Sequence, residues 1–231
     1  MKRFELAFLI FLLGSFCISL SLIPSLGAEQ KDGKNVRFRW AFGAMVGPKN
    51  DRRLVAITRD TVLKTGDELK MFVELQSSCF VYVIYRSEKD EIELIFPYKL
   101  EQFTKDYKIS KKYYIPEGDM WFRLDKDVGR ETFYLLASAK RLAGLEEVLE
   151  KYKSAEKAEK QALAKEILKE IRDTKKRYRK FTIVAERPVP IGGDVRGTAK
   201  DKKQFPPDID PIAENVSAAN FYGRSFTIDH K

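Results

Sequence analysis

The stretch that decides the fold is FVYVIYRSEKDEIELIFP, residues 80–97. Residues 80–85 are apolar at successive positions, which is typical of a strand covered on both faces. Residues 87–90 have the polar composition of a hairpin tip, and Ile92, Leu94 and Phe96 resume a strand pattern that Pro97 closes. The stretch therefore predicts two adjacent strands joined by a tight turn.

Short apolar patterns with period two lie on both sides of this hairpin, separated by turn signals such as 47–51 and 64–67. The chain has no internal repeat and no alternation of strands with helices. We therefore expect a mainly β protein, an antiparallel β-sandwich or partly open barrel of about nine strands. Besides the hairpin, the expected strands are 36–44, 54–57, 69–75, 120–124, 133–137, 181–185 and 221–230.

A different pattern occupies residues 142–180, where apolar residues recur at helical spacing. Neither proline nor glycine occurs between Leu145 and Lys180. The pattern predicts a long helical insertion, either one helix or a helical hairpin that bends within 154–161. Residues 186–214, rich in proline and glycine, are predicted to be a long loop.

Residues 1–28 combine Lys2 and Arg3 with an apolar run and a small-residue end, the pattern of a secretory signal peptide. An uncleaved membrane anchor is the alternative, whereas lipidation at Cys17 is disfavoured by the bulky Phe16 before it. We expect an exported protein, periplasmic or secreted, with one β-rich domain at 29–231. No later segment is apolar and long enough to span a membrane.

Composition excludes several classes of function. The 231 residues carry 43 lysines and arginines against 34 acids, a formal net charge of +9, with one histidine and two cysteines. A zinc ribbon or a disulfide-stapled fold is therefore excluded. We expect no metal and no cofactor, and we identify no catalytic residues, because a histidine-dependent triad would require His230. Cys79 is expected to be a buried, unreactive thiol.

Several ordered motifs resemble a known family. They are 64–70 (KTGDELK), 79–85 (CFVYVIY), 92–97 (IELIFP), 115–116 (IP) and 129–138 (GRETFYLLAS). Over roughly residues 55–140 the sequence resembles the bacterial family called domain of unknown function 4384. The resemblance implies an exported β-rich module, often beside other envelope or protease domains. It implies no catalytic residues.

A loop rich in lysine and tyrosine is the first candidate binding site. Cations between aromatic rings are suited to an anionic polymer, because charge attracts the polymer and flat rings contact it. The alternative is that the aromatic residues cap the core while the lysines form its solvated edge. The candidate ligand-binding residues are Lys105, Tyr107, Lys108, Lys111, Lys112 and Tyr113.

A second basic cluster ends the helical insertion, where cations could bind a phosphate-rich surface. The alternative is that cations simply offset the dipole at a helix C-terminus. The cluster consists of Lys175, Lys176, Arg177, Arg179 and Lys180.

Together these features predict a non-enzymatic protein of the cell envelope that works by binding. The first hypothesis is a protein-interaction or assembly module that docks an envelope protein through the helix at 142–180. The alternative is a binder of anionic glycan or lipid headgroups through the basic aromatic loop. Nucleic acid is a poor partner for an exported protein.

Overall fold

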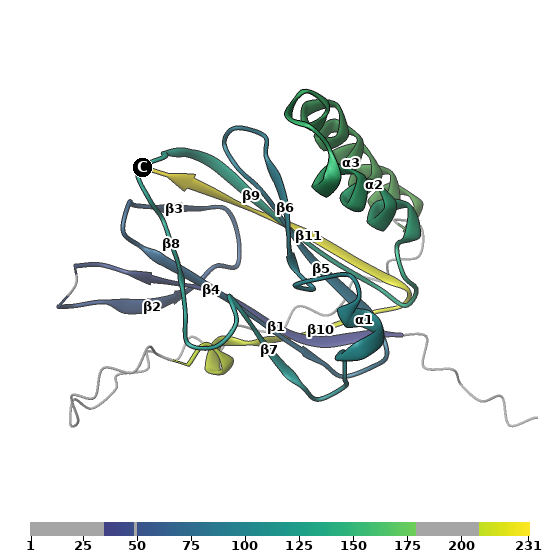
Figure 1. Ribbon diagram of the computed structural model, residues 1–231. Helices are drawn as coiled ribbons and strands as arrows, with labels where there is room; N and C mark the ends of the chain where they lie inside the picture. Colours follow the sequence, from purple (N-terminus) through teal and green to yellow (C-terminus); the bar gives the residue numbers. More distant parts are fainter. Residues whose placement is uncertain (1–34, 49, 179–207) are drawn as a thin grey trace, which may run out of the picture. The chain divides into compact units, whose positions relative to one another are not determined.

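The computed structural model describes residues 35–48, 50–178 and 208–231, which belong to one compact unit, Asp32–Lys231. Eleven strands in these ranges form two sheets, and helical segments flank them (Figure 1). The structure is therefore mainly β, with two open sheets and a helical segment at 143–178. Among the described residues, no helix is both long and apolar enough to cross a membrane.

The first sheet has six strands. Four follow one another in the order β10 (Glu214–Ala218), β1 (Val36–Val46), β4 (Glu68–Leu75) and β7 (Lys112–Ile115). Two short strands extend it, β2 (Arg53–Ala56) beside β1 and β8 (Phe122–Arg123) beside β4. All of these pairs are antiparallel.

The second sheet has five strands. Their order is β3 (Thr61–Leu63), β11 (Phe221–His230), β9 (Gly129–Ser138), β5 (Phe80–Arg86) and β6 (Ile92–Phe96). The short β3 runs parallel to β11, and the other neighbours are antiparallel. Strand β6 is an edge of this sheet, so it faces an open side of the sandwich.

The main core lies between the two sheets and is formed by the inward-facing side chains of their strands. Strand β1 supplies Phe38, Trp40 and Phe42, which alternate with residues of the opposite face, as the period of a strand requires. Their rings meet aromatic residues of the second sheet, among them Phe133 and Phe226. The aromatic residues that alternate along β1 therefore form a packed layer between the two sheets.

A second core lies on the outer face of the five-stranded sheet. Strand β5 sends Val81 and Val83 into the main core, and Tyr82 and Ile84 into this outer core. The prediction that residues 80–85 form a strand covered on both faces is confirmed. The cover is a pair of helices, α2 (Ala143–Ser154) and α3 (Lys157–Tyr178), visible beside that sheet in Figure 1.

The helical insertion is a hairpin, because the chain leaves helical geometry at Ala155 before α3 begins. The break lies within the stretch where the sequence indicated a bend. The apolar stripe of the hairpin, which includes Leu145, Tyr152 and Ile167, faces the outer core. The sequence left open whether this stripe covers its own sheet or a partner. In the structure it covers the five-stranded sheet.

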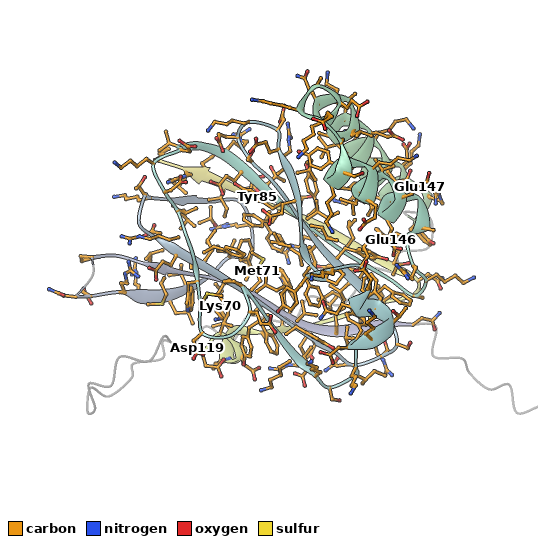
Figure 2. The ribbon with its side chains drawn as sticks, viewed as in Figure 1. Lys70, Met71, Tyr85, Asp119, Glu146 and Glu147 are labelled. Atoms are coloured by element: carbon orange, nitrogen blue, oxygen red, sulfur yellow. The ribbon has the colours of Figure 1, made fainter. Side chains whose placement is uncertain are left out.

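Buried polar contacts also fasten the hairpin to the sheet. The Tyr82 hydroxyl donates to Glu146 Oε1 at 2.5 Å, and the Tyr152 hydroxyl accepts from the Ile92 amide at 3.0 Å. Arg141 adds an ion pair to Glu146 at 2.6 Å. Glu146 is buried within α2 (Figure 2). Arg141 and the Tyr82 hydroxyl therefore compensate a carboxylate that is largely shielded from water.

Three strands were not expected from the sequence: β3, β7 and β10. Each is short, and each is defined by its pairing with a longer strand rather than by its own pattern. The segment at 102–105, expected to be loop, forms the short helix α1 (Gln102–Lys105), and Asp210–Ile212 form a 3-10 turn. The expected strand at 181–185 and loop residues 186–207 lie outside the described residues.

Candidate functional site

A groove gathers part of the basic aromatic loop. It is lined from α1, from β7, from the turn that follows β7, and from the end of α2. Four of the six candidate residues, Lys105, Lys111, Lys112 and Tyr113, contribute to its walls, whereas Tyr107 and Lys108 do not. Across the whole lining, five lysines (Lys99, Lys105, Lys111, Lys112, Lys153) face three carboxylates (Glu101, Asp106, Glu117). We call it the basic groove.

Of the two predicted tyrosines, Tyr113 belongs to the core and the half-buried Tyr107 packs against it. Tyr113 is 3% exposed, and its hydroxyl accepts from the Lys108 amide at 2.8 Å. The Tyr107 hydroxyl accepts from the Val81 amide at 2.8 Å, while its ring packs on Phe103 and Phe80. These rings pack at one end of the sandwich core, so they expose little surface to a ligand.

The groove lysines differ in their partners. Lys111 pairs with Asp106 and Lys112 with Asp210, so part of their charge is compensated within the protein. Lys99, Lys105 and Lys153 are exposed and make no ion pair with a described residue. Residual positive charge therefore comes from two stretches that are distant in sequence, residues 99–105 and the end of α2.

A buried lysine holds the turn beside this groove. Lys70 of β4 is 5% exposed, and its ammonium donates to the carbonyl oxygens of Gly118 and Met120 at 2.6 and 2.7 Å. Figure 2 places Asp119 close to it. Burial lowers the pKa of Lys70, and the nearby Asp119 partly offsets that shift. The contacts fix the path of the chain between β7 and β8.

The predicted basic cluster at the helix end is not a continuous patch in the described residues. Lys175 turns inward and donates to Ser225 Oγ of β11 at 3.0 Å, and burial lowers the pKa of Lys175. Arg177 forms an ion pair with Glu170, with 3.7 Å between an Arg177 guanidinium nitrogen and Glu170 Oε1, and Lys176 is exposed. Arg179 and Lys180 lie outside the described residues.

The single thiol of the described chain is buried. Cys79 is 2% exposed, and burial raises its pKa. We expect Cys79 of the folded protein to react with a disulfide reagent at pH 8 at least a hundredfold more slowly than in urea, because the thiolate is the nucleophile and the fold limits its formation and access. Absorbance of the released thiol measures this rate. Equal rates in both states would contradict the burial of Cys79.

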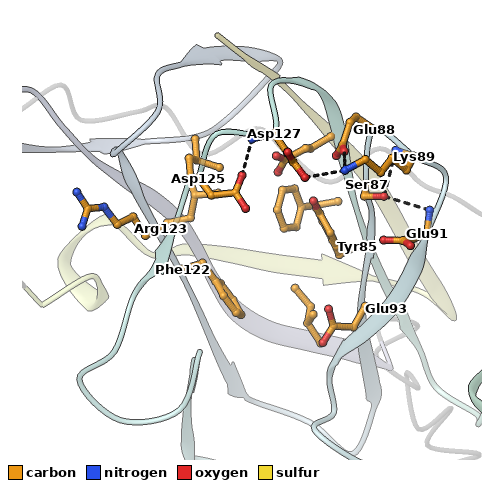
Figure 3. Close-up of a pocket in the computed structure, with 15 residues that line it drawn as sticks. Tyr85, Ser87, Glu88, Lys89, Glu91, Glu93, Phe122, Arg123, Asp125 and Asp127 are labelled. Atoms are coloured by element: carbon orange, nitrogen blue, oxygen red, sulfur yellow. Dashed lines mark hydrogen bonds and ion pairs between the residues drawn. The ribbon is translucent and has the colours of Figure 1, made fainter.

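A second concavity, of about 300 Å³, opens between the edge strand β6 and the short strand β8. Its apolar walls include Tyr85 and Phe133 from the second sheet and Phe122 from the first. Figure 3 shows Tyr85 and Phe122 beside carboxylates from several segments. The lining has six carboxylates (Glu88, Glu91, Glu93, Asp125, Asp127, Glu131) and two cations (Lys89, Arg123). We call it the acidic cavity.

Behind the wall of this cavity lies His230. Its Nε2 lies 3.1 Å from Thr65 Oγ1, and its Nδ1 lies 3.5 Å from Glu131 Oε1 without a hydrogen-bond partner in the described residues. The Glu131 side chain is 9% exposed. Burial raises the pKa of Glu131, which the neighbouring His230 partly offsets.

In the described part of the chain, no group of three or more metal-ligating side chains is placed to hold an ion. The acidic cavity was not predicted from the sequence, because its residues come from four separate stretches: residue 69 and residues 85–95, 122–127 and 131–133. A possible signal was the acidic pair Asp125 and Asp127 next to the strand residue Phe122.

The order of the strand motifs along β4, β5, β6 and β9 agrees with a family model. Residues 62–141 match the model described as "Domain of unknown function (DUF4384)". This segment is a DUF4384 domain. Searches of the curated proteins and of the solved structures find no match for the chain.

The DUF4384 domain supplies six of the eleven strands, β4 to β9, and its first residues belong to β3. Strands β1, β2, β10 and β11 complete the two sheets from outside its bounds. The resemblance over roughly 55–140 is thus confirmed, with bounds of 62–141. All residues that line the acidic cavity lie inside the domain. The basic groove combines the domain with Lys153 of the hairpin.

Proposed function

We propose that the protein is an exported, non-enzymatic binding module of the cell envelope and that its basic groove binds an anionic glycan. The observation that carries the proposal is the convergence of five lysines against three carboxylates in one concave surface. Export is proposed from the signal-like residues 1–28. A non-enzymatic role is supported by the position of the sole histidine, His230, which is 3% exposed and packed beside Glu131.

The groove chemistry favours a polymer with repeated negative charges. Lysine ammonium groups act as point charges with several donors, so they suit anions spaced along a chain. Tyr98 and Tyr114 line the same groove and are half-buried, so each offers part of a ring. Their hydroxyls already donate within the protein, Tyr98 to the Tyr114 carbonyl oxygen and Tyr114 to Asp208 Oδ1. A sugar polymer with carboxylate groups can use both features at once.

The assembly role through the hairpin has weaker support in the geometry. The hairpin's apolar residues already cover the second sheet, and its outward side chains are mainly charged. A protein partner at that surface would have to recognise charge alone, which contributes little per exposed pair. We therefore propose the groove as the principal binding surface.

The test uses polygalacturonate as an anionic glycan and dextran as a neutral one, with binding measured by isothermal titration calorimetry. We expect the protein to bind polygalacturonate only, and less tightly as salt rises. The double variant Lys105→Gln, Lys153→Gln should bind about tenfold more weakly, as two exposed charge contacts of somewhat under 1 kcal/mol each would give.

The matched control is Lys157→Gln, Lys165→Gln, which removes two exposed lysines from α3. An equal loss of affinity in this control would show attraction by net charge and contradict the groove. Tighter binding to vesicles of anionic phospholipid than to polygalacturonate would instead assign the groove to lipid headgroups.

A further inference from the structure

The acidic cavity has a charge opposite to that of the whole protein. The chain carries a formal net charge of +9, yet the cavity lining holds six carboxylates and two cations. A cationic group is therefore attracted at this place, whereas the net charge of the protein repels it. The cavity lies within the DUF4384 domain and is separate from the basic groove.

The two cations of the lining do not neutralise the cavity. Lys89 bridges Glu88 and Asp127 at 3.3 and 2.6 Å. The Arg123 guanidinium points away from the carboxylates in Figure 3. Three further acids, Glu91, Glu93 and Asp125, make no ion pair with a described residue. The surplus negative charge thus lies on exposed carboxylates at the mouth.

The inner wall contains polar groups that have lost water without gaining a cation. The Glu131 side chain is 9% exposed, and its nearest basic atom is His230 Nδ1 at 3.5 Å, which makes no hydrogen bond to a described residue. Tyr85 lies beside Glu131, and burial raises the pKa of both groups. A cation entering from solvent would compensate this desolvated carboxyl.

The apolar walls narrow the choice of cation. Tyr85 and Phe133 pack with ring centroids 5.1 Å apart, and Phe122 at the mouth is 37% exposed. A guanidinium is planar, weakly hydrated and able to stack on rings while it donates to carboxylates in pairs, whereas an ammonium is compact and strongly hydrated. The volume of about 300 Å³ is at the lower end of the range for ligand pockets, so it suits one side chain.

We propose that the acidic cavity receives an arginine side chain of a partner protein. Two exposed apolar residues support a protein segment over a free small cation. Phe122 lines the mouth and Val128, 55% exposed, follows Asp127 of the rim. Apolar residues that flank the arginine in an extended partner segment can cover them, which a free small cation cannot do.

The probe is an acetylated and amidated five-residue peptide with one arginine between two leucines. Its matched control carries citrulline, which keeps the shape of the side chain and removes its charge. We titrate both into isotopically labelled protein and follow backbone amide shifts by NMR. The arginine peptide should shift amides around Tyr85, Phe122 and Glu131, and the citrulline peptide should bind at least tenfold more weakly.

Two double variants locate the effect. Glu93→Gln with Asp125→Asn removes two exposed charges of the cavity and should weaken binding of the arginine peptide at least fivefold. Glu150→Gln with Glu159→Gln removes the same charge from the exposed face of the hairpin and should change affinity less than twofold.

Equal weakening by the two double variants would overturn the proposal, as would equal affinity for the arginine and citrulline peptides or the absence of shifts at the cavity. If free arginine amide or spermidine bound as tightly as the peptide, the cavity would be a site for small cations. The proposal that it receives a segment of a partner protein would then be wrong. None of these results depends on the glycan experiment, so the two proposals can fail separately.

Discussion

Replacing Phe226 with alanine is expected to lower the free energy of unfolding by about 3–5 kcal/mol, the usual range for removing a buried aromatic ring from a close-packed core. Phe226 of β11 is 0% exposed. Its ring packs on Trp40 and Phe42 of the opposite sheet, with centroids 6.1 and 5.5 Å away. The substitution therefore opens a cavity between the two sheets, which urea denaturation followed by tryptophan fluorescence would measure.

Phe122→Ala is the matched control, because it removes the same ring from a position that is 37% exposed. We expect this variant to lose about 1 kcal/mol or less. A similar loss in both variants would mean that Phe226 does not join the sheets. The comparison is informative because β11 lies outside the DUF4384 domain, so its core residue tests whether the domain depends on the strands around it.

Strand β5 could be predicted from the sequence because both of its faces are apolar, and burial on both faces leaves few alternatives for such a run. The helical hairpin was predicted from the sequence as one of two alternatives, the other being a single long helix. Its stripe follows helical spacing, and the break at Ala155 lies in the alanine-rich and charged stretch where the stripe fades. Local periodicity decides these elements, so the sequence is sufficient for them.

Strand β7 shows why other elements could not be predicted. Lys112 and Tyr114 turn one way and Tyr113 and Ile115 the other, a pattern that an exposed loop with buried tyrosines would share. Pairing with β4, from Met71 to Glu74, makes the segment a strand. This pairing depends on residues about forty positions away, which a local pattern does not specify.

The residues of the candidate sites also differ in whether they could be predicted from the sequence. Lys105, Lys111 and Lys112 could be found because they are close together in sequence and rich in charge. Lys153 could not, because it reaches the groove from the end of α2. The acidic cavity depends entirely on tertiary pairing, which brings the β8 segment next to β6 across the open side of the sandwich.

Replacing Ile167 with alanine is expected to lower the free energy of unfolding by about 2–4 kcal/mol. Ile167 of α3 is 0% exposed and belongs to the outer core with Tyr82 and Ile84 of β5. A cavity there weakens the contact between hairpin and sheet, so amide hydrogen exchange in residues 143–178 should accelerate before the sandwich itself opens. Urea denaturation and hydrogen exchange measured on the same sample would separate these two effects.

Leu168→Ala is the control for this variant, since Leu168 is the next residue on the same helix and only partly buried. It should cost about 1 kcal/mol or less and leave hydrogen exchange in the hairpin nearly unchanged. If Ile167→Ala cost no more than Leu168→Ala, the apolar stripe would not be held against the sheet in solution. The stripe would then be free to dock a partner, and the assembly role through residues 142–180 would regain the support that the packed hairpin removes from it.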